Sequence, residues 1–341
     1  MQSSAKIKVL VIRFSSIGDI VLCTPVIRCL KNIPDKDTEV HFLTKKSFAG
    51  FLSANPHIDK IHTLGKSLKS VITLLKQENY DYIVDLHNNL RSLRVKLALG
   101  KPSGSFNKLN KQKWLLTNFK YNRMPDIHIV DRYMAAAAPL GIKNDHKGLD
   151  FFIPHADKIK PEDLPEGFGD GYTAFVIGGT YATKRLPDDM IVDICRKLLK
   201  PVILLGGPED ADAGYRIAAA VGQKVFNACG KYSLNASASL VEQATAIISH
   251  DTGLMHIAAA FGKPVASVWG NTVPELGMYP YQPGPKANAS QIFEVRELSC
   301  RPCSKIGYNQ CPKKHFRCMK NQDINAIAQW ANNFAAVQKT S

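Results

Sequence analysis

Short runs of branched apolar residues alternate along this chain with longer segments whose apolar residues recur at helical spacing. The short runs are of strand length and rich in Val and Ile, which is typical of strands buried on both faces of a parallel sheet. Strands alternating with helices in this way predict βαβ units. In the first half we expect strands at 8–12, 39–43, 60–63 and 81–85, and helices at 17–31, 47–54, 68–77 and 127–140, the first of them restarting or kinking at Pro25.

A linker separates this pattern from a second copy of it. Residues 154–171 hold three prolines, three glycines and five acids, and the alternation then resumes. Strands are expected at 173–177, 201–205, near 225, and at 246–248, 265–269 and 291–295. We therefore predict an α/β protein with two Rossmann-like domains, residues 1–160 and 161–322, whose parallel sheets face a central cleft. Residues 323–341 form a last helix, for which packing back onto the first domain is one option.

The segment 249–272 has the most informative pattern. It reads as the end of a strand, a turn, a helix that ends before Gly262 and Pro264, and another strand. The turn places backbone amides and the Thr252 hydroxyl at a helix N-terminus, where an anion is stabilised. Gly253 would let a phosphate approach the backbone closely. The alternative is an ordinary capped βα turn.

Composition excludes several classes of protein. The 341 residues are 45% hydrophobic, no apolar stretch approaches the ~18 residues of a membrane span, and Arg13 interrupts the N-terminal apolar run too early for a signal peptide. We expect a cytoplasmic protein with reduced cysteines. The net charge of +15 is uneven, with nine Lys or Arg and no acid in 91–123, and six with no acid in 298–322. Such clusters suit nucleic acid, anionic lipid or a polyanionic substrate, or are solvated surface.

Three polar residues that follow predicted strands are candidates for chemistry. The turn after the first strand lacks the dinucleotide fingerprint, and the chain contains neither a P-loop nor a G-x-S-x-G elbow. That turn offers Asp19, either as a general base or as a helix cap. Lys184 follows two glycines and Thr180, a combination that suits a diphosphate, although a surface lysine is the alternative. Asp251 either pairs with Lys184 or accepts hydroxyls from a sugar.

Two further patterns could bind metal. Asp210 and Asp212 match D-x-D, but side chains at i and i+2 of a helix diverge, so acids of a first helical turn explain them better. Four cysteines near the C-terminus could hold a structural zinc, with His315 as a spare ligand: Cys300, Cys303, Cys311 and Cys318. The first pair has ligand spacing and the second does not, so a packed thiol cluster remains the alternative.

Several of these segments together resemble glycosyltransferase family 9, the ADP-heptose:lipopolysaccharide heptosyltransferases. The similarity rests on VLVIRFSSIGDIVLCTPVIRCLK at 9–31, DLHNNLRS at 85–92, the 180–187 loop, 230–234 and, most strongly, SHDTGLMHIAAAFGKPVASVWGNT at 249–272. The cysteine-rich tail also resembles tails of this family. The chain departs from the family pattern at His250, where Asn is frequent, and at Gly179, where some members carry Thr.

The resemblance implies a GT-B fold and inverting transfer of a heptose from ADP-heptose to the inner core of lipopolysaccharide, either a lipid A-Kdo or a heptosyl acceptor. It implies Asp19 as the base, Lys184 at the leaving diphosphate and no metal required for catalysis. Expected substrate-binding residues are Ser16, Gly18, Arg91, Thr180, Glu209, Asp251, Thr252, Gly253, Leu254 and His256. The acceptor is an anionic lipid-linked saccharide at the inner leaflet, so we expect a peripheral protein of the cytoplasmic membrane that binds no nucleic acid. A GT-B-like protein that binds nucleotide or anionic lipid without turnover is the alternative.

Overall fold

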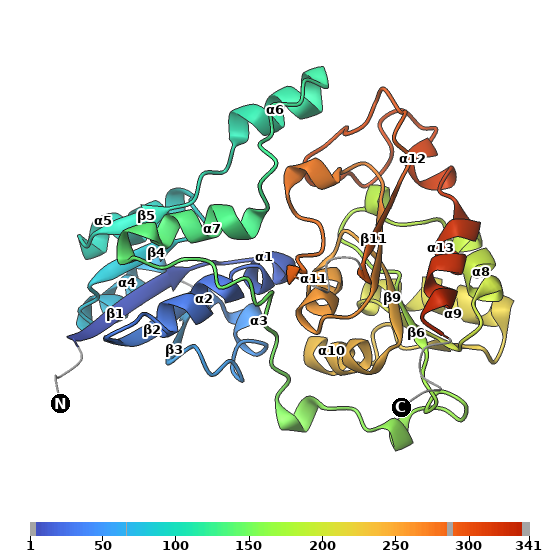
Figure 1. The fold of residues 1–341 in the computed structure, drawn as a ribbon, viewed down its shortest axis with the longest axis horizontal. Helices are drawn as coiled ribbons and strands as arrows, with labels where there is room; N and C mark the ends of the chain where they lie inside the picture. The colour runs from blue at the N-terminus through green and yellow to red at the C-terminus, as the bar shows by residue number, and fades with distance from the viewer. Residues whose placement is uncertain (1–4, 66, 285–288, 336–341) are drawn as a thin grey trace. The chain divides into compact units, whose positions relative to one another are not determined.

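A computed structural model describes residues 5–65, 67–284 and 289–335, and these divide into two compact units. The first unit contains the chain up to Lys108 together with Ile127–Pro154, and the second contains Leu109–Asp126 together with the chain from His155 onward (Figure 1). Within the described ranges, no helix combines the length and the apolar character needed to cross a membrane.

A five-stranded parallel sheet in the order β3-β2-β1-β4-β5 forms the centre of the first unit. Its inner strands are buried because their apolar side chains are covered on both faces, as parallel sheets require; Val9–Ile12 of β1 is fully buried. The strands are β1 (Ala5–Ile12), β2 (Lys36–Lys45), β3 (Lys60–Leu64), β4 (Tyr82–Asp85) and β5 (Ser103–Ser105).

Helices of the first unit connect these strands. They are α1 (Ile17–Val21), α2 (Thr24–Lys31), α3 (Lys46–Ala49), α4 (Leu68–Gln77), α5 (Leu90–Leu99) and α7 (Ile129–Ala137). The predicted restart at Pro25 is confirmed, because α2 begins at Thr24 with this proline in its first turn, where the missing N–H loses no helical bond.

The second unit contains a six-stranded parallel sheet in the order β11-β10-β9-β6-β7-β8. Its strands are β6 (Thr173–Val176), β7 (Val202–Leu205), β8 (Val225–Asn227), β9 (Ala246–His250), β10 (Val265–Trp269) and β11 (Gln291–Glu294). Its helices are α6 (Asn110–Phe119), α8 (Asp188–Lys197), α9 (Ala211–Val221), α10 (Leu234–Gln243), α11 (Gly253–Ala260), α12 (Arg317–Lys320) and α13 (Ile324–Asn333). Apolar clusters fill both faces of this sheet.

The C-terminal helix belongs to the core of the second unit, and its packing on the first unit stays a prediction. Ile327 and Trp330 of α13 belong to the same buried cluster as Ile194 of α8, so α13 completes one face of the second sheet. Burying these apolar side chains is what anchors the helix there. The expected continuation of the helix to residue 337 lies partly outside the described residues.

The basic stretch 91–123 does not belong wholly to the first unit, as the predicted boundaries required. Leu116 of α6 packs with Val273 and Leu276, and the Lys120 ammonium donates to the carbonyl of Pro302 at 2.7 Å. The stretch therefore divides after Lys108, and α6 contributes its lysines to the second unit.

Strand order places one switch point in each sheet. Counted along its own chain, the second sheet has the order 3-2-1-4-5-6 reversed, and the first has 3-2-1-4-5, so consecutive connections leave in opposite directions next to the first strand of each unit. Ligands of such sheets bind beyond the carboxyl ends of the strands at that point. In the first unit β1 and β4 end there, with Ile12 beside Asp85, and in the second β6 and β9 end there, with Val176 beside Ser249.

Candidate active site

Asp19 lies in the first turn of α1, directly after the switch-point strand β1. One carboxylate oxygen accepts from the Ser16 amide at 3.2 Å and from the Ser16 hydroxyl at 2.8 Å. The other lies 2.6 Å from the guanidinium of Arg13 and accepts from the Tyr133 hydroxyl at 3.3 Å. The carboxylate therefore caps the helix and also belongs to a polar cluster, so the two interpretations of Asp19 are compatible.

Arg13 is fixed more firmly than its partner. Its side chain is almost fully buried and donates to the carbonyls of Ser15 at 2.7 Å and Leu86 at 2.5 Å, and to the Tyr133 hydroxyl at 3.0 Å. Burial opposes the charge of this guanidinium, but Asp19 and Tyr133 outweigh it and raise the pKa of Arg13 above its ordinary value. A guanidinium held in this way fixes the orientation of the Asp19 carboxylate.

Sequence reasoning missed Arg13 and Tyr133 as members of this site. Arg13 could have been recognised because it is a charged residue at the end of a strand that was predicted to be fully buried. A buried charge requires a partner of opposite charge. His87 lies nearby, with its ring edge-on to Phe14 at 4.8 Å. Burial, together with the charges of Arg13 and Lys108, lowers the pKa of His87 to about 4, so this ring is neutral at pH 7.

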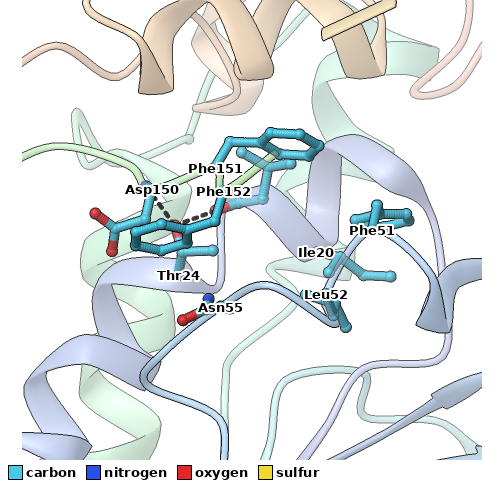
Figure 2. Close-up of a pocket in the computed structure, with 9 residues that line it drawn as sticks. Ile20, Thr24, Phe51, Leu52, Asn55, Asp150, Phe151 and Phe152 are labelled. Carbon is cyan, nitrogen blue, oxygen red and sulfur yellow. Dashed lines mark hydrogen bonds between the residues drawn. The ribbon is translucent and has the colours of Figure 1, made fainter. Parts of the chain in front are cut away.

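A small pocket lies against the helix that carries Asp19 (Figure 2). Phe51 and Phe151 stack with ring centroids 6.2 Å apart, and the Thr24 hydroxyl accepts from the Asp150 amide at 2.8 Å. The lining residues are Ile20, Val21, Thr24, Phe51, Leu52, Asn55, Asp150, Phe151 and Phe152. Most of these side chains are apolar, so the pocket mainly records how the segment 150–152 packs against α1 and α2.

The other predicted residues of the first unit are placed differently. Ser16 contacts Asp19, and Gly18 is buried within α1. Arg91 is exposed in the first turn of α5, where its amide bonds the side chain of Asn89. No distance joins Arg91 to the carboxylate cluster, so its predicted role stays a prediction.

Lys184 and Asp251 form the centre of the candidate site in the second unit. The Lys184 ammonium lies 2.6 Å from the Asp251 carboxylate, which also accepts from the Thr272 hydroxyl at 3.0 Å. Both side chains are mostly shielded from water, with 16% and 14% exposed. The pairing that the sequence left open is therefore present, and it joins the loop after β6 to the turn after β9.

Two glycines allow the loop after β6 to pass close to its neighbours. A Cβ on Gly178 would lie 2.3 Å from a carboxylate oxygen of Asp210, and one on Gly179 would contact Thr252 and Arg185. Asp210 is buried, accepts from the Gly207 amide at 2.9 Å and pairs with Arg185 at 3.0 Å. Asp210 is thus a structural residue, in agreement with the rejection of a D-x-D metal clamp.

The turn after β9 is where the sequence predicted an anion site. Thr252 is the N-cap of α11, yet no described side chain accepts a hydrogen bond from the first amides of this helix; the Thr252 hydroxyl instead lies 3.3 Å from that of Ser249. The amides beginning at Gly253 are therefore available to a phosphate. Thr180 and Glu209 are exposed on neighbouring loops, Leu254 is half-buried, and His256 is buried within α11.

His250 connects this turn to a neighbouring loop through a buried hydrogen bond. It is fully buried, and its Nε2 accepts from the Leu186 amide at 3.0 Å, which ties the turn to the loop that follows Lys184. Burial lowers the pKa of His250 to about 4, so the ring is neutral at pH 7. An Asn at this position, which the resemblance led us to expect, would offer a comparable acceptor.

The C-terminal cysteines gather without forming a closed ligand set. Burial and the neighbouring thiols of Cys300 and Cys311 raise the pKa of Cys303, and burial with the thiols of Cys303 and Cys311 raises that of Cys318 to about 12. The Cys300 sulfur lies 3.7 Å from Nε2 of His315. Within the described part of the chain, no three of these ligand atoms lie within 4.8 Å of one another.

A buried polar cluster in the first unit, His41, His62 and Glu78, does meet that distance. The facing ring nitrogens of His41 and His62 are 3.1 Å apart, and the ammonium groups of Lys8 and Lys60 lie 3.2 and 2.5 Å from Glu78. Because two cations already neutralise the carboxylate, the cluster is better described as an ion-pair network than as a metal site.

Comparison with known proteins points to one family. The model of glycosyltransferase family 9 (heptosyltransferase) matches residues 68–313. Lipopolysaccharide heptosyltransferase 1 of Campylobacter coli is 24% identical over 290 residues, which cover 78% of this chain and 84% of the relative. Lipopolysaccharide heptosyltransferase 3 of Escherichia coli is 26% identical over 284 residues, covering 75% and 80%.

Solved structures share the fold. The ADP-heptose lps heptosyltransferase II of E. coli superposes with a TM-score of 0.71 at 20% identity, covering 96% of this chain and 98% of that one. A family 9 glycosyl transferase from Veillonella parvula gives a TM-score of 0.76 at 18% identity, covering 96% of each. The E. coli heptosyltransferase WaaC with ADP gives 0.69 at 20% identity, covering 96% and 100%. The predicted GT-B arrangement of two Rossmann-like sheets is confirmed.

Proposed function

Because this chain belongs to glycosyltransferase family 9, the heptosyltransferases, we propose that it transfers a heptose from ADP-heptose to the anionic inner core of a lipopolysaccharide, either a lipid A-Kdo or a heptosyl acceptor. The observation that carries the proposal is that each unit holds a charged cluster at its own switch point: the Asp19 carboxylate with Arg13 in the first, and Lys184 with Asp251 in the second. The relatives named as lipopolysaccharide heptosyltransferases support the choice of donor and acceptor.

The proposed reaction is a single displacement that inverts the anomeric carbon. Asp19 takes the proton from an acceptor hydroxyl while the oxygen of that hydroxyl forms a bond to the anomeric carbon. At the same time the bond from this carbon to the diphosphate oxygen breaks. An oxocarbenium-like transition state is expected, as in other glycosyl chemistry. Arg13 and Tyr133 are positioning residues, because they hold one carboxylate oxygen, while Ser16 contacts the other.

ADP leaves with an added negative charge that the second unit stabilises. Lys184, the Thr180 hydroxyl and the amides at the start of α11 supply the positive end of this interaction. Glu209 binds the ribose, and Asp251, with Leu254 and His256 on the same turn and helix, positions the sugar. When the diphosphate binds, Lys184 exchanges part of its contact with Asp251 for a contact with the diphosphate. Before binding, the ion pair with Asp251 holds the ammonium in position.

We propose that transfer requires no metal, since Lys184 and the helix terminus supply the positive charge. The cysteine tail is a separate matter. Cys300, Cys303, Cys311 and Cys318 supply thiols that suit a structural zinc, although their sulfurs are not at ligand distances in this structure. Such an ion would hold the tail together and take no part in the transfer.

We also propose that the protein works at the inner face of the cytoplasmic membrane, where its acceptor is anchored. The nine basic residues between Arg91 and Arg123, with no acid among them, support this. Each basic residue near an anionic surface contributes about 1 kcal/mol. The aromatic side chains of Trp114 and Phe119 are exposed on α6 and suit the headgroup region.

A turnover assay tests the proposed reaction. Purified protein is incubated with ADP-heptose and either lipid A-Kdo or its deacylated, water-soluble form, and ADP release and product mass are measured. We expect ADP and a product heavier by one heptose, with inverted anomeric configuration by NMR. Binding of ADP-heptose with no product from either acceptor, or from heptosylated versions of them, would establish the non-catalytic alternative instead.

A further inference from the structure

Helix α5 exposes a row of leucines that no described residue of its own unit covers. Ser92 and Val95 form the buried face of the helix. Leu90, Leu93 and Leu97 lie on the opposite face, at i, i+3 and i+7, and are 76%, 43% and 72% exposed. We refer to these three residues as the leucine stripe.

The leucine stripe is not needed to form the helix. The Asn89 side chain caps α5 by accepting from the amides of Arg91 and Ser92 at 2.9 and 3.0 Å, and Gly100 ends it in the left-handed conformation at φ 62°. The opposite face already packs toward α4 and the sheet. Three leucines kept in water on a stable helix indicate a partner outside the unit.

The charges on the segment that carries the stripe are all positive. Arg91, Arg94 and Lys101 are exposed beside it, whereas the fourth cation of this segment, Lys96, is turned to Asp85 at 3.2 Å and to the Ser105 hydroxyl at 2.6 Å. There is no acid between Leu86 and Asn122. An apolar ridge with flanking arginines is complementary to the interface of an anionic bilayer, where leucines enter the acyl boundary and guanidinium groups meet phosphates.

A second copy of the chain is a poorer occupant. In a symmetric dimer the same patch meets itself, so the arginines of one copy would approach those of the other. That like-charge contact opposes association, whereas a bilayer containing anionic lipid relieves it.

We propose that the leucine stripe of α5 inserts into the surface of an anionic membrane and is the apolar anchor of this protein, a proposal that rests on the proposed function at the membrane. It adds a site that the basic stretch alone does not provide. Charge brings the protein to the surface and depends on salt, while inserted leucines hold it there and depend little on salt.

Vesicle binding by the full chain tests the proposal. The probes are vesicles of phosphatidylethanolamine with phosphatidylglycerol, and vesicles of phosphatidylcholine alone. A triple variant, Leu90→Ser with Leu93→Ser and Leu97→Ser, should bind the anionic vesicles at least ~10-fold more weakly, since even partial burial of three leucines exceeds that factor. A Leu199→Ser variant is the matched control, because Leu199 is 73% exposed in the second unit and should leave binding unchanged.

Two further measurements keep the result interpretable. Circular dichroism should show the triple variant folded, as expected for exposed positions, and its transfer to the deacylated acceptor should equal that of the unsubstituted protein. A Leu97→Trp variant should bind more tightly and show emission that is blue-shifted by anionic vesicles and quenched by lipids carrying a quencher at the acyl boundary.

Unchanged vesicle binding by the triple variant would overturn the proposal. So would a change of oligomeric state without a change in vesicle binding, since the stripe would then be an interface between copies. A protein that binds vesicles through the stripe but transfers no heptose to the soluble acceptor would refute the proposed function and leave the anchor standing.

Discussion

At the scale of single residues, Asp19 has the contacts expected of a general base with a fixed orientation. Its partners Arg13, Tyr133 and Ser16 occupy defined positions around it. Asp19→Asn preserves the shape and the cap but removes the proton acceptor, so we expect kcat for heptose transfer to fall by about 10²–10⁴ while ADP-heptose affinity stays within a few-fold.

The control for this variant is another acid at a helix start. Asp323 accepts from the Ala326 amide as the N-cap of α13, and Asp323→Asn should leave kcat unchanged. If Asp19→Asn also keeps nearly full kcat, Asp19 is only a cap.

Lys184 should affect binding and catalysis together. Lys184→Ala removes the ammonium next to Asp251 and leaves that carboxylate with the Thr272 hydroxyl, so a bound diphosphate would meet a carboxylate without its counter-charge. We expect weaker ADP binding by calorimetry and a lower kcat, since the charge acts in both the ground and the transition state. Lys200→Ala, which loses only a bond to the Asp170 carbonyl, is the control. Unchanged ADP affinity would place Lys184 outside the site.

The lowered pKa of His250 predicts how the free energy of unfolding depends on pH. Its folded pKa, about 4, lies below the ordinary 6.5, so protonation favours the unfolded chain. The stability it contributes is fully present above pH 6.5 and is lost as the pH falls toward 4, amounting to about 2 kcal/mol between pH 7 and pH 5. His250→Asn should lose less over this interval in denaturant titrations. An equal loss in both proteins would show that other groups control the acid sensitivity.

The residues recognised from the sequence share a feature. Asp19, Lys184 and Asp251 each follow a predicted strand closely, so local pattern was enough to place them at a sheet edge. Tyr133 lies 114 positions from Asp19, on a helix whose predicted role was only to close the domain. Partners of this kind depend on tertiary packing, which a single sequence does not encode in any local period.

At the scale of elements, the cysteine tail makes the clearest prediction. Metal analysis of protein purified without chelator should find about one zinc per chain, lost on replacing Cys300 and Cys303 by Ser, and the Tm should fall with it. Heptose transfer should continue when EDTA is added during the assay. Freshly reduced protein without metal would contradict this and identify a packed thiol cluster instead.

Helices α5 and α6 are among those that were not predicted, for identifiable reasons. Helix α5 has apolar residues on both its buried and its exposed face, so its sequence lacks the single stripe by which amphipathic helices are recognised. Helix α6 begins after Leu109 and ends before Lys120, which are both left-handed without being glycine, so the usual boundary signals are missing. Strands rich in branched residues were easier to predict from the sequence, because strands buried on both faces appear as continuous apolar runs.

At the scale of the whole molecule, the charge of +15 should govern encounter with the acceptor. Exposed charges are screened beyond roughly 8 Å at physiological salt. Raising the salt concentration should therefore raise KM for lipid A-Kdo presented in anionic vesicles, and change KM for the deacylated acceptor less. Equal salt responses of the two acceptors would mean that the basic surface binds the saccharide alone.

The alternation of strands and helices predicted the two parallel sheets, and the comparisons confirm the fold. The unit boundaries could not be predicted in the same way. The linker 154–171 marks one crossing of the chain between units, but the crossings at 108–109 and 126–127 carry no comparable composition. A basic, aromatic helix gives no sign in its own sequence of which core will receive it.

Residues 109–126, which include α6, belong to the second unit although they lie within the sequence of the first. This has a consequence for expressing the protein as two separate polypeptides. A polypeptide ending at residue 154 would carry α6 as an arm with no core of its own, since Leu116 packs on Val273 and Leu276. A second polypeptide beginning at residue 155 would expose the apolar side chains of Val273 and Leu276 that α6 covers. Produced together, the two pieces would therefore recombine through this arm, and deleting residues 109–126 from the first piece would abolish the complementation.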